Sequence, residues 1–258
     1  MANNAEVGYF GKLPQRGDFV SSGLGRDFLD IWDQWLQDAI ACSRDQLGDA
    51  WLDIYLTSPI WRFLLCDGIC GGSAWAGVLI PSVDKVGRYY PLTIAAPLPA
   101  GSNPMQFSVL ADDWFRAAEA LALEPLADDA PDLDVFGDRV RALGLPGGDN
   151  DEQFTRLTPL MADTAMRVES ASDAQSLVSQ QGALAGGLLA GMLLRYSLWW
   201  TEGSHRVGPN MLICKHLPSA EKYAALLNGD WQQFGWMGDR LVPLGARAAV
   251  GVSSVGEA

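Results

Sequence analysis

The chain has 258 residues, of which 48% are hydrophobic and 19% charged, and its formal net charge is −13. This composition excludes wholesale disorder, and a chain of this length can bury a sizeable core. Such an acidic protein repels phosphate backbones and anionic lipid headgroups, so we expect no nucleic acid partner and no membrane surface. Residues 1–100 carry 7 Lys and Arg against 11 Asp and Glu, so a neutral or basic patch is expected there rather than in the rest of the chain.

In chain order, the first 100 residues predict a strand, two helices and a β-meander. Apolar residues at three- and four-residue steps indicate the helices, the first with Asp27 as its N-cap, and short apolar runs between Gly or Pro indicate the strands. Short connections between these strands favour antiparallel hairpins. The predicted elements are a strand at 7–13, helices at 27–47 and 49–56, and strands at 61–66, 73–80 and 88–97, to which 7–10 can add a fourth strand.

Residues 101–258 predict a mostly helical second half with a terminal hairpin and helix. The helices are expected at 107–123, 133–143, 172–194 and 219–228, and the hairpin at 196–201 and 210–216. The apolar run at 183–194 is too short to cross a bilayer, so it predicts a buried helix against a sheet and no membrane insertion. The whole chain, 1–258, is thus expected to be a single α/β (α+β) domain, an antiparallel meander flanked by helices.

No pattern selects a catalytic residue, a metal ligand or a cofactor. His205 and His216 are the only histidines, and neither C-x-x-C nor H-x₃₋₅-H spacing accompanies them, so no zinc site is predicted. Motifs of serine hydrolases, P-loops and dinucleotide sites are absent from the sequence, and we expect no enzyme and no cofactor. The N-terminus has no signal-peptide pattern, and the four cysteines are too sparse for a disulfide scaffold, so a cytoplasmic protein with free thiols is expected.

Residues 8–20 form the first of two stretches that suit protein binding. Gly and Pro set sharp turns in it, and Phe10, Leu13 and Phe19 are expected to pack inward. Lys12, Arg16 and Asp18 are then expected on a rigid surface loop. These three are the candidate protein-binding residues of the first stretch.

Residues 79–92 form the second stretch, a tight connection between two predicted strands. Its candidate protein-binding residues are Ser82, Asp84, Arg88 and Tyr89, because Arg88 emerges beside two tyrosines and can stack or pair with a carboxylate. Asp84 can equally pair with Arg88 or cap the turn, so a structural and a binding role both remain open for this stretch.

Together these stretches resemble the N-terminal signature of the TagF family, accessory proteins of bacterial type VI secretion systems. The matching pieces are GYFGKLPQRGDFV, FLDIWDQWL, Trp51 with Tyr55-Leu56 and Pro59 to Phe63, and GVLIPSVDKVGRYYPLTIA. They cover residues 1–100 densely, and beyond residue 100 SLWWTEG is the clearest piece.

The resemblance implies a loosely longin-like sheet flanked by helices. It also implies a non-catalytic, post-translational negative regulator of type VI secretion that binds the forkhead-associated (Fha) scaffold protein of the apparatus. Two alternatives stay open, a hydrolase that uses Asp84 and a histidine, and a structural component of the secretion machine. The oligomeric state is not set by the sequence.

Overall fold

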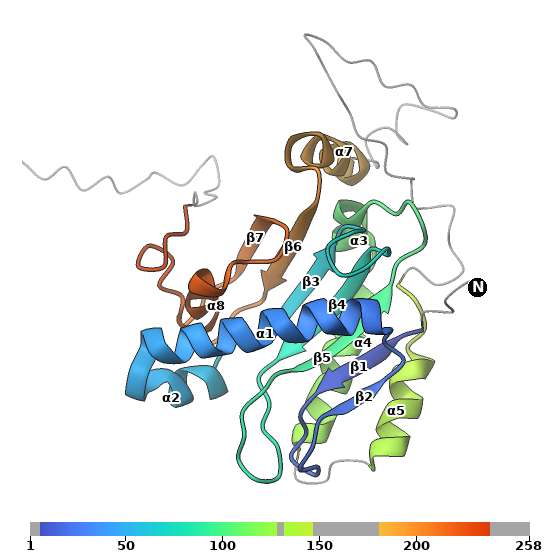
Figure 1. Cartoon of the computed structure of the whole chain (residues 1–258). Helices are drawn as coiled ribbons and strands as arrows, with labels where there is room; N and C mark the ends of the chain where they lie inside the picture. Colours follow the sequence, from blue (N-terminus) through green and yellow to red (C-terminus); the bar gives the residue numbers. More distant parts are fainter. Residues whose placement is uncertain (1–5, 128–131, 147–180, 238–258) are drawn as a thin grey trace, which may run out of the picture.

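The computed structural model describes residues 6–127, 132–146 and 181–237. Within them, seven strands form one antiparallel sheet in the order β2-β1-β5-β4-β3-β6-β7 (Figure 1). The strands are β1 (Gly8–Gly11), β2 (Val20–Ser22), β3 (Trp61–Leu65), β4 (Trp75–Ile80), β5 (Leu92–Pro97), β6 (Tyr196–Thr201) and β7 (Asn210–Lys215).

The sheet confirms the predicted meander and the predicted hairpin. β3, β4 and β5 pair consecutively, β1 adds to β5 as the fourth strand, and β6 pairs with β7. The hairpin does not stand alone, because β6 pairs with β3, with Arg62 opposite Trp200. The second half of the chain therefore completes the sheet that the first half begins.

One face of the sheet is covered by α1 (Arg26–Leu47), together with α2 (Trp51–Leu56) and α8 (Tyr223–Asn228). Trp32 of α1 lies against Phe63 of β3, with ring centroids 4.6 Å apart, and stacks parallel to Trp199 of β6. Its indole N–H donates a 2.9 Å hydrogen bond to Thr93 Oγ1 on β5. A single tryptophan thus contacts three strands, and aromatic packing fixes α1 across the sheet.

The opposite face is covered by α3 (Pro104–Leu110), α4 (Asp112–Leu123) and α5 (Leu133–Ala142). Phe63 of β3 faces α1, and neighbouring residues of a strand point to opposite faces of the sheet. The side chain of Arg62 therefore points away from α1. Its buried guanidinium donates to Glu119 at 2.7 Å and to Asp112 at 2.7 Å, both on α4. Because a buried cation needs such partners, this pairing fixes α4 on the sheet.

Three helix predictions need correction. α1 begins at Arg26 after Gly25, so Asp27 lies in the first turn and is not the N-cap. The helix predicted at 107–123 is two helices, α3 and α4, separated at Ala111. α7 (Gln181–Leu193) packs mainly on α3 and exposes Leu188 and Met192, so its predicted burial against the sheet is wrong. The first part of the predicted helix, 172–180, lies outside the described residues.

The short 3-10 helices complete the fold. They are η1 (Gly48–Ala50), η2 (Glu124–Leu126) and η4 (Ala220–Lys222). η4 runs into α8, and α8 ends at Gly229 in the left-handed conformation, as its sequence predicted. In the described part of the chain, no helix combines the length and the apolar character that crossing a bilayer requires.

Candidate protein-binding site

Two connectors emerge together at one end of the sheet. The first connector, residues 12–19, joins β1 to β2, and the second, residues 81–91, joins β4 to β5. Because β1 and β5 are antiparallel partners, the end of β1 lies beside the start of β5. Gly11 makes this approach feasible, since a Cβ at its position would lie 2.2 Å from the Pro91 carbonyl oxygen.

Asp84 holds the two connectors together. Its fully buried carboxylate accepts a 2.7 Å hydrogen bond from Lys12 Nζ on the first connector and another of 2.7 Å from Arg88 Nε on the second. The backbone N–H groups of Val86 and Arg88 donate to its other oxygen at 3.0 and 2.8 Å. We call Lys12, Asp84 and Arg88 the Asp84 cluster.

Backbone contacts add to this junction. The Lys85 N–H donates to the Arg16 carbonyl at 2.9 Å, and Ser82 Oγ donates to the Lys12 carbonyl at 2.6 Å. Arg88 also donates from its guanidinium to the Gly17 carbonyl. With buried groups from both sides paired in this way, the two connectors form one rigid unit.

The electrostatics of the Asp84 cluster follow from its partners. Burial alone would raise the pKa of the Asp84 carboxyl. The hydrogen bonds from Lys12 and from the backbone and side chain of Arg88 outweigh burial, and they hold the pKa of this carboxyl well below its ordinary value. Asp84 is therefore a stable anion and a weak base.

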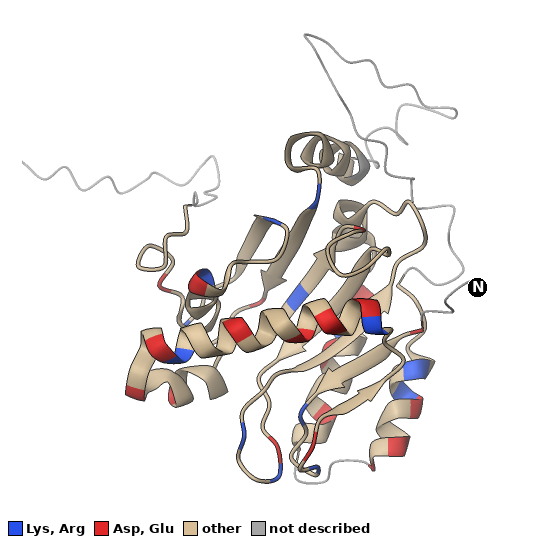
Figure 2. Cartoon of the chain, in the orientation of Figure 1, with Lys and Arg blue, Asp and Glu red and all other residues tan. Residues whose placement is uncertain are grey.

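The outer surface of the connectors is exposed and mostly cationic. We define the connector face as six of the exposed connector residues, namely Arg16, Asp18, Phe19, Lys85, Val86 and Arg88. Three of these are cations and one is an acid, whereas α1 alone carries five Asp and two Arg. Figure 2 shows more red than blue segments along α1, and both blue and red segments in the connectors below the sheet. The face also exposes apolar surface, because Val86 is 68% exposed.

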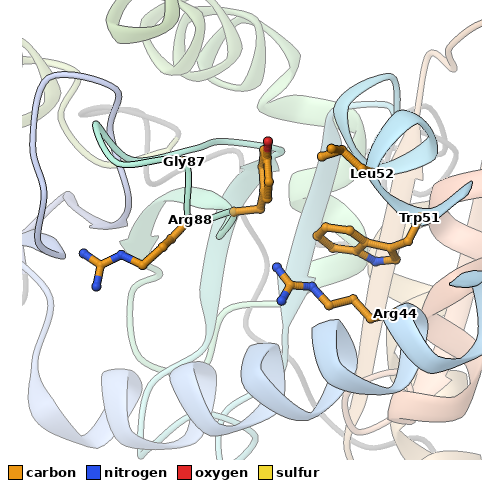
Figure 3. A pocket seen from close by; sticks show the side chains of 6 residues that line it. Arg44, Trp51, Leu52, Gly87 and Arg88 are labelled. Carbon is orange, nitrogen blue, oxygen red and sulfur yellow. The ribbon is translucent and has the colours of Figure 1, made fainter. Parts of the chain in front are cut away.

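A pocket of about 510 Å³ adjoins the connector face. It is lined by Arg44 at the end of α1, Trp51 and Leu52 on α2, and Gly87, Arg88 and Tyr89 on the second connector (Figure 3). The Arg44 guanidinium carbon lies 4.3 Å from the centre of a Trp51 ring, a cation–π contact. In Figure 3 the Arg44 guanidinium lies between Trp51 and the second connector, and the Arg88 side chain turns away from Trp51.

The sequence predicted some of these positions and missed others. Arg16, Asp18 and Arg88 are exposed as expected, and half-buried Tyr89 lines the pocket. Lys12 was expected on the surface, which is wrong, because it is buried in its ion pair with Asp84.

Phe19 and the second connector also differ in part from expectation. Phe19 does not pack inward as expected, since the residue is 48% exposed and its ring stacks on the outer side of the core residue Phe10. Ser82 and Asp84 are buried, and Asp84 pairs with Arg88. This is the structural role that the sequence left open beside a binding role. Arg44, Trp51 and Leu52 were not among the predicted site residues, because no local sequence pattern joins them to the second connector.

No histidine joins Asp84. The donors to its carboxylate are Lys12, Val86 and Arg88, so His205 and His216 are not among its partners. Across the described ranges, no group of three or more His, Cys, Asp or Glu side chains is placed to hold a metal ion.

A family model described as the TagF N-terminal domain, type VI secretion system-associated, matches residues 8–143, which span both connectors and the pocket. The chain belongs to the TagF family. This membership associates the protein with type VI secretion. The protein PA0076 from Pseudomonas aeruginosa PAO1, known from a crystal structure, has 35% sequence identity and a TM-score of 0.73, over 92% of this chain and 97% of that one. No curated protein matches the sequence.

Proposed function

We propose that this protein is a non-catalytic, post-translational negative regulator of type VI secretion that acts in the cytoplasm by binding the forkhead-associated scaffold protein of the apparatus. Family membership supports the link to the secretion system. The TagF resemblance supports repression as the effect and the scaffold as the partner. The connector face is the single observation that carries the binding role.

The connector face has the properties of a protein-binding surface. It is cationic in a protein of net charge −13, so it attracts an acidic patch on a partner that the rest of the surface repels. Phe19 and Val86 add apolar area among the cations, which is the usual composition of a recognition patch. Because the Asp84 cluster already fixes both connectors, little conformational entropy is lost when a partner binds.

The same cluster argues against a hydrolase that uses Asp84 as its base. General bases work best with a pKa near the operating pH, and the pKa of Asp84 is held far below it. The carboxylate is also enclosed by its own donors and has no room for a substrate proton. This geometry supports a structural role for Asp84 beneath a binding face.

The regulatory role is tested by deleting the gene and measuring type VI secretion. Loss of a repressor raises the amount of secreted substrate, and reintroducing the wild-type gene lowers it again. Loss of a structural component instead abolishes secretion. Abolished secretion would therefore contradict the proposed function and support the machine-component alternative.

The binding role is tested with Arg16→Glu, which reverses one exposed charge of the connector face. The dissociation constant for the purified scaffold protein, measured by isothermal titration calorimetry, should rise about tenfold while the melting temperature stays unchanged. Arg26→Glu is the matched control, because Arg26 is also an exposed arginine and lies outside the connectors. If Arg16→Glu lowers binding and melting temperature together, Arg16 is a structural residue.

A further inference from the structure

We propose that the pocket beside the connector face receives a carboxylate side chain, Asp or Glu, of the protein partner. The inference rests on the proposed function for the identity of that partner. Arg44 is the residue that would bind the carboxylate, with Trp51 and Tyr89 as walls of the pocket. None of these three residues was selected by a catalytic or metal-binding pattern.

Arg44 is held against Trp51, but no acidic side chain of the described residues pairs with its charge. Its guanidinium lies over Trp51, and it makes no hydrogen bond or ion pair with any residue in the described parts of the chain. A guanidinium has five N–H donors, and stacking on an aromatic ring uses its flat face and leaves the edge N–H groups free. The Arg44 side chain therefore presents unused donors to the pocket.

The walls of the pocket are fixed before any ligand arrives. The Trp51 indole N–H donates to Ser43 Oγ at 2.9 Å, and the Trp51 ring stacks on Tyr55 with centroids 4.7 Å apart. Tyr55 in turn donates to the Ser82 carbonyl at 2.9 Å. This chain of contacts runs from the end of α1 to the second connector, so the pocket and the connector face are one continuous rigid surface.

The charge of the pocket selects an anion. Of the described residues that line it, the charged ones are Arg44 and Arg88. The acid bound to Arg88 is Asp84, which is buried and already paired with Lys12. An anionic side chain from outside therefore meets a cationic pocket with aromatic walls, where partial exclusion of water strengthens the pairing.

The number of free donors favours a carboxylate over a phosphoryl group. Arg88 already donates from Nε to Asp84 and from one terminal nitrogen to Gly17, and its side chain turns away from Trp51 (Figure 3). Phosphoryl groups are usually bound by clusters of arginines, whereas one guanidinium edge matches the two oxygens of a carboxylate. Arg44 supplies one such edge.

The first test uses a probe that does not require the scaffold. Ac-Leu-Glu-Leu-NH₂ and Ac-Leu-Gln-Leu-NH₂ are titrated into the ¹⁵N-labelled protein, and the indole N–H signal of Trp51, assigned with Trp51→Phe, is followed by NMR. The glutamate peptide should shift this signal, the glutamine peptide should not, and Arg44→Gln should abolish the shift. Equal shifts with both peptides, or none with either, would overturn the inference.

The second test uses the whole partner. Arg44→Gln and Arg44→Glu should each weaken binding of the purified scaffold protein at least about tenfold. Arg44→Lys, which keeps the charge but loses the planar fork, should fall between them and the wild type. Arg26→Glu is the control, since Arg26 lies on the same helix, 18 residues earlier and about 27 Å away. Circular dichroism melting identifies any variant that fails to fold.

The outcomes separate the two proposals. If the wild type binds the scaffold and the Arg44 variants bind equally well, the pocket inference fails and the proposed function stands. If the wild type does not bind the scaffold, the proposed function fails and the peptide titration still decides the pocket. Phosphatase treatment of the scaffold should leave binding unchanged, and loss of binding would replace the carboxylate with a phosphoryl group.

Discussion

Lys12 and Arg16 lie four residues apart on the first connector but have opposite environments. Lys12 is buried against Asp84, whereas Arg16 is exposed. Lys12→Met should therefore lower the free energy of unfolding by about 3 kcal/mol, because it breaks a buried ion pair and leaves Arg88 as the cationic partner of Asp84, besides the backbone N–H groups of Val86 and Arg88. Arg16→Glu should change it by less than about 0.5 kcal/mol. Urea denaturation measures both, and equal losses would contradict the difference in burial.

Asp84 makes the stability of the protein depend on pH in the acid range. Its folded-state pKa lies below the ordinary value of 3.8, so folding favours the ionised carboxylate. The stability that it contributes is complete above this ordinary pKa, which the unfolded chain has, and is lost as the pH falls from there through the lower folded-state pKa. The wild type should thus lose stability more steeply than Asp84→Asn from about pH 4 downward, measured by thermal melts. Parallel profiles would show that Asp84 contributes nothing in this range.

The residues that the sequence misplaced have partners far away in the chain. The sequence around Lys12 predicts an exposed cation on a loop. In the structure β1 is buried along its whole length, and the residue that follows it, Lys12, is buried as well. Its partner Asp84 is 72 residues away, and no local pattern shows the pair. Arg44 lies in the last turn of α1, where a cation already favours the helix dipole, so its position gave no sign of a pocket.

At the level of elements, local patterns predicted the strands and their consecutive pairing. The meander and the β6–β7 hairpin follow from short apolar runs joined by short connections. The pairing of β3 with β6 could not be read in this way, because it joins Arg62 to Trp200 across more than half the chain. The break between α3 and α4 comes just before Asp112, whose carboxylate accepts a hydrogen bond from Arg62 of the sheet, a contact that no local pattern shows.

Gly77 of β4 shows how closely the elements pack. A Cβ at this position would lie 2.3 Å from the Phe63 ring and 2.6 Å from the Ile94 carbonyl oxygen. Gly77→Ala should therefore cost about 1–3 kcal/mol of stability, the usual cost of overpacking. Gly72→Ala is the control, because a Cβ added at Gly72 would meet no atom within 4 Å. Chemical denaturation measures both variants, and an equal effect would contradict the packing of β3 against β4.

At the scale of the whole molecule, the charge of the connector face differs from the net charge of the chain. The chain carries a net charge of −13, but the charged residues of the connector face are three cations and one acid, and the charged residues that line the adjoining pocket are Arg44 and Arg88. A partner is therefore steered to one end of the sheet, and the steering weakens as salt screens the charges. The sequence predicted only that a neutral or basic patch lies in residues 1–100, because it cannot place residues 16, 44 and 88 on one surface.

The union of two distant connectors also limits what a fragment of this protein can do. The face exists only where β1 pairs with β5 and Lys12 reaches Asp84 across 72 residues of chain. A synthetic peptide that copies either connector lacks the other half and the sheet that orders it. Competitive inhibitors that imitate this surface therefore need a scaffold that displays both loops at a fixed separation, and a fragment that holds only one connector cannot replace the intact molecule.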